Sequence, residues 1–150
     1  MTAQTLLQAL GQLLLSGLAT LSFGVLFAVP VRHYACCAAT GAAGWVVYWA
    51  LTAAGLGPAL ASLLAVIPLA GLARFFAVWR KAPITIFLFC GIFPLVPGAG
   101  IYYTAYFFIR AENALALAKG AETFKIAVAL ALGIAVTLSL PLPRRHRQEH

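Results

Sequence analysis

Hydrophobic positions along this chain form long continuous runs, and short polar or Pro/Gly-rich breaks separate them. A bilayer core of about 30 Å needs roughly 20 apolar residues of helix, and helices satisfy their own backbone hydrogen bonds in lipid. The pattern therefore predicts an all-α integral membrane protein, a bundle of about five transmembrane helices in a single domain, residues 1–150. The expected helices are residues 6–29, 34–56, 59–78, 84–109 and 124–140, followed by a basic C-terminal tail at 141–150.

The fourth apolar run contains the motif FPLVPGAGIYY, which interrupts it near its middle. Pro94 and Pro97 remove backbone donors, while Gly98 and Gly100 allow the chain to unwind locally. Irregular backbone at membrane depth is tolerated where protein buries it or where it lines a cavity. A helix that restarts near Gly98 would present free amides and the positive end of its dipole, which is how secondary transporters hold substrate carboxylates. The motif therefore predicts a broken fourth helix with a substrate site at the break.

The candidate substrate-binding residues lie at this break, with one cation added from the third helix. Two interpretations of each group stay open. The Pro/Gly motif is either a functional break or a kink that only shapes packing, and the tyrosines are either hydroxyl donors or interfacial and packing residues. Arg74 either attracts a carboxylate substrate on its path through the protein or extends its side chain to the lipid headgroups. The residues are Pro94, Pro97, Gly98, Ala99, Gly100, Tyr102, Tyr103 and Arg74.

Composition supports the membrane class. The chain is 63% hydrophobic and 9% charged, whereas a soluble domain has about a quarter charged residues. The net charge of +7 is scattered between the apolar runs and in the tail, as expected for residues that flank transmembrane helices, so no nucleic acid is expected as a partner. Small residues around Gly41 and Gly44 predict close helix packing, and homo-oligomerisation is possible.

Basic residues predict the orientation. With five crossings, one group of cations lies on the same side of the membrane as the C-terminal tail. A smaller group, whose charge two glutamates partly offset, lies on the other side. Since cytoplasmic loops carry the excess of Lys and Arg, the N-terminus is expected outside and the C-terminus inside. If the fourth run is instead a re-entrant hairpin, the C-terminal tail lies on the opposite side. Residues 110–125 are expected to form a solvated loop or an interfacial helix. The first group is Arg32, Arg74, Arg80, Lys81, Arg144, Arg145 and Arg147; the second is Arg110, Lys119 and Lys125, with Glu112 and Glu122.

Catalytic and metal-binding patterns are missing from the sequence. The expected membrane core holds no Asp, Glu, His or Lys, and His33 falls in the first loop beside Arg32. Cys36, Cys37 and Cys90 show no CxxC spacing, and no nucleophile-base set or phosphate loop can be assembled. We therefore expect no enzyme activity, no cofactor and no metal.

Three stretches resemble a known family: FGVLFAVPVRH, CCAATGAAGW and KAPITIFLFCGIFPLVPGAGIYYTAY. They are similar to the threonine/serine exporter (ThrE-type) family, and more narrowly to its small YjjB-type subunits, over about residues 21–109. Pro94, Pro97 and Gly98 are the motif positions, and Tyr102 and Arg32 match less specifically. The family offers no established catalytic residues to transfer.

The resemblance implies a subunit of a two-component secondary exporter in the bacterial cytoplasmic (inner) membrane. Its partner would be a larger ThrE-type (YjjP-like) membrane subunit, giving a hetero-oligomer in the lipid bilayer. Its substrate would be a small carboxylate metabolite, either threonine and serine or dicarboxylates such as succinate. The alternative is a non-transporting membrane scaffold that stabilises the larger partner.

Overall fold

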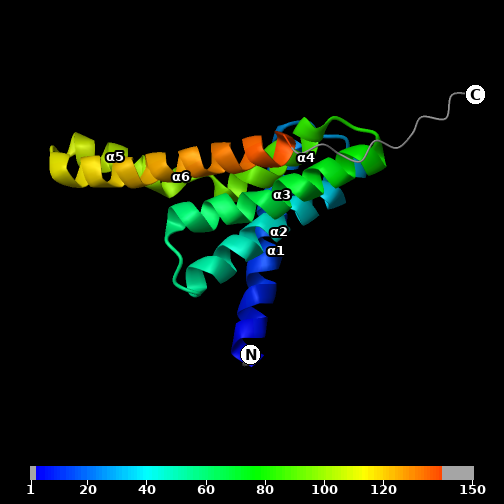
Figure 1. Ribbon diagram of the computed structural model, residues 1–150, viewed down its shortest axis with the longest axis horizontal. Helices are drawn as coiled ribbons and strands as arrows, with labels where there is room; N and C mark the ends of the chain where they lie inside the picture. The colour runs from blue at the N-terminus through cyan, green and yellow to red at the C-terminus, as the bar shows by residue number, and fades with distance from the viewer. Residues whose placement is uncertain (1–2, 140–150) are drawn as a thin grey trace, which may run out of the picture.

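The computed structural model describes residues 3–139, and within them it contains helices and no strands (Figure 1). This confirms the all-α class. A short 3-10 helix, η1, precedes α2, and a second, η2, follows α4. The elements are α1 (Ala3–Leu26), η1 (Val31–His33), α2 (Tyr34–Ala53), α3 (Pro58–Arg80), α4 (Ile84–Ile92), η2 (Phe93–Leu95), α5 (Gly98–Ile109) and α6 (Asn113–Ser139).

Four segments are long and apolar enough to cross a membrane: Leu6–Leu26, Val31–Ala53, Pro58–Arg80 and Asn113–Ser139. The segments Ile84–Leu95 and Gly98–Ile109 pass the same test only together, and they meet at a bend of 51°. The described residues therefore contain four candidate spans, or five if the bent pair crosses as one. The fourth apolar run is broken at the Pro/Gly motif, as its sequence indicates.

Local backbone geometry sets several helix ends. Ala28 has a φ of 51° after α1, so this helix ends at Leu26, before the proline at position 30. Lys81 has a φ of 49° and ends α3 as a left-handed C-cap. Such conformations reverse the chain after a helix and satisfy its last carbonyls.

The last helix begins at Asn113 and not near residue 124. Residues 113–125, assigned by their charge to a loop or an interfacial helix, form the first part of α6. Two contacts explain why this polar stretch is helical. Lys119 pairs with Glu122 at 3.0 Å on the same helix, and α5 packs along this part of α6.

The core lies where α2, α3 and α4 meet, and small residues bring these helices together. A Cβ added at Gly44 would lie 2.6 Å from Leu69 Cδ1, and one added at Gly91 would lie 2.8 Å from Thr40 Cγ2. A Cβ added at Gly41 would likewise clash with the Thr20 side chain of α1. The packing face predicted around Gly41 and Gly44 is thus present, and both residues are buried.

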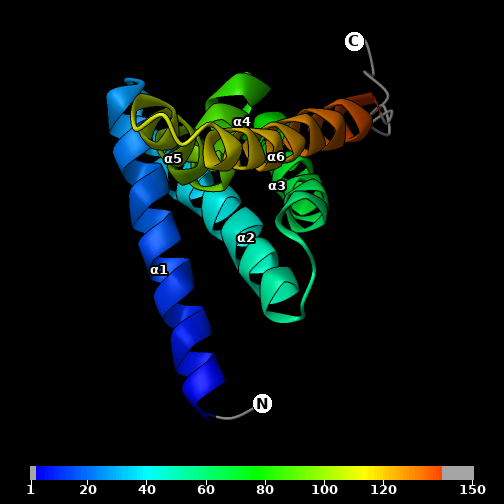
Figure 2. The ribbon, with the colours of Figure 1, turned by 90° about the vertical axis from the view of Figure 1, so that its left-hand side faces the viewer.

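The hairpin of α5 and the first half of α6, residues 98–125, extends away from this core; we call it the arm (Figure 1). Within α5 no residue is buried. Figure 2 shows α1 running alongside α2, with its N-terminal end extending beyond the end of α2. The broken span therefore links a packed core, through α4, to an exposed arm, through α5.

Candidate functional site

The backbone leaves its helical path between Leu95 and Gly98. The Val96 amide donates to the carbonyls of Ile92 and Phe93, each at 3.2 Å. The Gly98 amide turns back to the Val96 carbonyl at 2.7 Å, and the regular pattern resumes when Ile101 donates to Pro97 at 3.1 Å. Pro97 carries no N–H, so it cannot continue the helix that ends before it.

Four backbone groups at the break have no backbone hydrogen bond within the described part of the chain. They are the amides of Ala99 and Gly100 and the carbonyls of Pro94 and Leu95. The amides belong to the first turn of α5, where a helix has no internal acceptors for its donors. The carbonyls lack donors because the Gly98 amide is bound to Val96 and the Ala99 amide begins a new helix. Hydrogen-bond donors and acceptors are therefore available on either side of Pro97.

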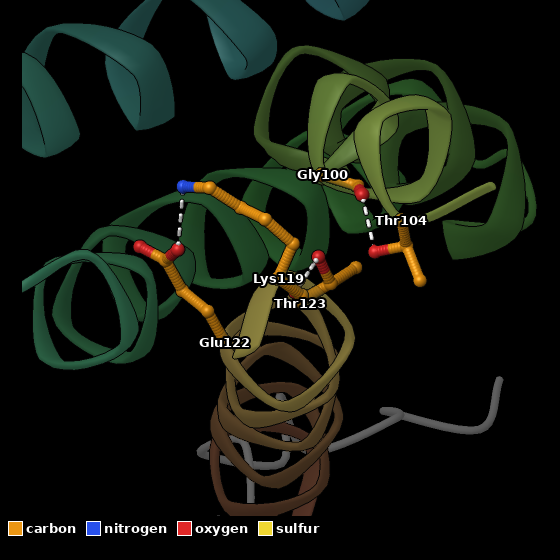
Figure 3. A network of polar contacts seen from close by, with 5 residues as sticks. All are labelled: Gly100, Thr104, Lys119, Glu122 and Thr123. Carbon is orange, nitrogen blue, oxygen red and sulfur yellow. Dashed lines mark hydrogen bonds and ion pairs between the residues drawn. The ribbon is translucent and has the colours of Figure 1, made fainter. Parts of the chain in front are cut away.

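A cavity of about 520 Å³ runs beside the break, between α5 and α6. Gly100 contacts Thr123 and Gly120 contacts Thr104, so a glycine faces a threonine twice along the helix pair. Both threonine hydroxyls donate within their own helices, to Gly100 and to Lys119, at 2.7 Å each (Figure 3). Their oxygen lone pairs remain able to accept. The lining residues are Pro97, Ile101, Thr104, Ala105, Phe108, Gly120, Thr123, Phe124 and Ala127.

Thr123 and Gly120 were absent from the residues selected by sequence, and the structure places them against the motif. Gly120 lies between the charged residues Lys119 and Glu122, and Thr123 follows them, so the charges made this part of α6 resemble a loop in the sequence. The available signal was small residues spaced along two adjacent segments, as in close helix pairs within membranes.

The tyrosines of α5 do not line this cavity. Tyr102 is 63% exposed and Tyr103 is 48% exposed. Tyr102 stacks on Tyr106 with ring centroids 6.2 Å apart, and the Tyr106 hydroxyl accepts from Arg110 at 2.6 Å. The structure thus gathers the tyrosines with one another, and not with the residues that line the cavity.

Arg74 contacts the end of α6. Its Nη1 donates to the carbonyl of Thr137, whose partner four residues later in a helix would be residue 141. Residue 141 is a proline and has no N–H, so it cannot supply that hydrogen bond. The guanidinium supplies the hydrogen bond and places a positive charge near the negative end of the helix dipole.

This contact gives a first prediction. Replacing Arg74 by glutamine removes the cation at the end of α6, and replacing it by lysine retains it. We expect Arg74→Gln to lower the free energy of unfolding by about 1.5–3 kcal/mol, the usual contribution of a hydrogen bond with a charged donor. Thermal unfolding in detergent measures this, with Arg74→Lys as the control. Equal melting temperatures for wild type and Arg74→Gln would contradict the capping role.

The fold and the break define an all-helical membrane protein with a discontinuous helix, the construction that places substrate sites in secondary transporters. A family model described as Threonine/Serine exporter, ThrE matches residues 12–140, and the chain belongs to this family. The match confirms the resemblance drawn from the motifs. No match is found among curated proteins or among solved structures. The family is one of membrane transporters, and no enzyme activity follows from it.

Proposed function

We propose that this chain is the small subunit of a two-component exporter in the bacterial cytoplasmic membrane, with the break at Pro97 as its substrate site. Family membership supports export of threonine and serine. A larger YjjP-like membrane subunit would pack on the arm, since no residue of α5 is buried within this chain. The basic residues support an outside N-terminus and an inside C-terminus.

The observation that carries the proposal is the pair of free amides next to the pair of free carbonyls. Amides at a helix N-terminus suit a carboxylate, and unwound carbonyls suit a cation. A zwitterionic amino acid such as threonine uses both sets. A dicarboxylate such as succinate uses the amides of Ala99 and Gly100 and leaves the carbonyls of Pro94 and Leu95 unpaired. The break therefore favours an α-amino acid over a dicarboxylate as the exported carboxylate metabolite.

The bend supplies the movement that export requires. α4 packs against α2 and α3, while α5 contacts α6 in the arm. A change in the 51° bend between them would move the arm relative to the core. Such a movement would open the break toward one side of the membrane at a time, as alternating access requires.

A second candidate function is a non-transporting scaffold for the larger subunit. The exposed leucines along α1, among them Leu7, Leu14 and Leu18, and the exposed α5 provide helix surfaces for such a role. A scaffold needs these surfaces but makes no use of the free backbone groups. Because the break shapes the surface that α5 presents, a scaffold predicts that mutations of the break reduce complex assembly and substrate flux in parallel.

Replacing both Pro97 and Gly98 by alanine tests the site. Alanine at position 97 restores an N–H and alanine at 98 favours the helix, so the free groups would be drawn into a continuous helix. We expect threonine efflux from proteoliposomes that contain both subunits to fall at least about tenfold, since hydrogen bonds to a charged group contribute about 1.5–3 kcal/mol each.

The matched control is Pro68→Ala with Gly71→Ala, the same exchange inside the unbroken α3. A Cβ at Gly71 meets nothing within 4 Å, so this variant adds no clash. Co-purification of the two subunits reports assembly. Efflux at the wild-type rate in the Pro97/Gly98 variant would refute the site, and a parallel loss of assembly would favour the scaffold.

A further inference from the structure

His33 is a buried ionisable residue that the sequence places in a loop. It ends η1 and is 2% exposed, and its ring meets Phe87 of α4 edge to face, with centroids 5.5 Å apart. The candidate span Val31–Ala53 includes it at its start, so the residue assigned to the first loop is covered by the fold. The reason is tertiary: α4 packs over the start of α2 and covers the imidazole.

The hydrogen bonds of His33 define its protonation state. Arg32 Nε donates to His33 Nε2 at 3.0 Å. A guanidinium has no acceptor, so Nε2 must present a lone pair, and the ring is neutral with its hydrogen on Nδ1. His33 Nδ1 is buried and has no hydrogen-bond partner among the described residues. Buried polar groups are almost always paired, so this donor is an exception, and Arg32 supplies the one hydrogen bond of the ring among the described residues.

The charges around His33 are positive. Arg32 and Arg80 both act on the ring, and Arg80 itself lies over Trp79 at 4.6 Å. The described carboxylates belong elsewhere, since Glu112 pairs with Arg110 and Glu122 with Lys119 in the arm and its connection. Arg32 of η1 and Arg80 of α3 are the charges that act on the imidazole. The elements α2 and α4 also carry titratable residues, among them Tyr34, Cys36, Cys37 and Cys90, whereas α1 carries none.

We propose that His33 is a proton-binding site coupled to the binding of a small carboxylate at Arg32. A proton on Nε2 removes the acceptor that holds Arg32 and places two cations side by side, with Arg80 nearby. A carboxylate at Arg32 offsets these charges and therefore favours the proton. By linkage, the proton favours the carboxylate equally. The coupling rests on the proposed function for its substrate class, and it uses a site separate from the break.

Calorimetric titration of the full chain in lipid nanodiscs tests the coupling, with L-threonine and succinate as separate probes. Measurement in two buffers of different ionisation enthalpy gives the protons taken up per ligand bound. We expect net proton uptake near neutral pH and binding that tightens by about 5- to 150-fold from pH 8 to pH 6, the usual range for coupled sites. Glutamine can accept from Arg32 but does not titrate, so His33→Gln should lose both effects.

The matched control is the double variant His146→Gln, His150→Gln, which removes the other two imidazoles and should behave as wild type. Proton uptake retained by His33→Gln would overturn the proposal.

A second measurement needs no transport substrate: the imidazole 15N spectrum of histidine-labelled protein. Acetate should raise the titration midpoint of His33 in wild type and leave it unchanged in Arg32→Gln. A midpoint insensitive to acetate in wild type would refute the coupling, whereas absent threonine and succinate efflux with a sensitive midpoint would refute only the proposed function.

Discussion

Gly133→Val is expected to separate α3 from α6 and to cause a large loss of folded protein. A Cβ at position 133 would lie 2.1 Å from Val66 Cγ1 and 3.1 Å from the carbonyl oxygen of Leu63. Val66 is completely buried, so its side chain has no free space to enter, and the Leu63 oxygen belongs to helix backbone. Forcing added carbon atoms into a packed interior costs about 1–3 kcal/mol, a large share of a typical stability of 5–15 kcal/mol.

Thermal unfolding followed by fluorescence-detected gel filtration measures this effect. Gly71→Val is the matched control, since it makes the same exchange on α3 where a Cβ meets nothing within 4 Å. Both variants carry the same change in helix propensity, so their difference isolates the contact with Val66. We expect a clear fall in melting temperature for Gly133→Val relative to Gly71→Val. Equal melting temperatures would show that α3 and α6 do not depend on this close approach.

The broken helix was predictable because its cause is local. Pro97 lacks an N–H wherever it stands, and two prolines with two glycines interrupt any helix within a turn or two. The face around Gly41 and Gly44 was predictable for a similar reason, because small residues in apolar runs indicate close helix contacts. In each case the chemistry of a few neighbouring residues determines the result, without reference to distant parts of the chain.

The parts that sequence missed depend on tertiary contacts. Arg74 and Thr137 are 63 positions apart, and their hydrogen bond appears only when α3 and α6 lie side by side. The start of α6 at Asn113 was hidden because hydropathy treats Lys119 and Glu122 as loop residues, whereas α5 supports this stretch from the side. The burial of His33 likewise requires α4 to cover it.

The position of the tyrosines on α5 could be predicted in part, because it depends on both local periodicity and tertiary packing. Helical periodicity separates Thr104 and Phe108 from Tyr102 and Tyr106 on α5, so two faces were visible in the sequence. Which face meets α6 depends on the glycine-threonine contacts, such as that of Gly100 with Thr123. The sequence therefore shows the two faces of α5, and the packing of α5 on α6 determines which of them lines the cavity.

Ala99→Pro should weaken binding of a carboxylate substrate without removing α5. The Ala99 amide has no backbone partner within the described chain, so a proline here deletes a free donor and breaks no internal hydrogen bond. Position 99 is the second residue of α5, and proline is tolerated in the first turn of a helix. A hydrogen bond to a charged group contributes about 1.5–3 kcal/mol, so we expect the dissociation constant for threonine to rise about 10- to 150-fold.

Ala114→Pro is the control for this variant, because Ala114 holds the corresponding second position of α6, which begins at Asn113. It carries the same proline at the start of another helix, at a position that does not line the cavity beside the break. Helical content by circular dichroism should stay at the wild-type level in both variants, and only Ala99→Pro should lose affinity. Equal threonine binding by the two variants would exclude the Ala99 amide as a ligand. The break would then act by its bend alone, and the carboxylate would be held elsewhere in the complex.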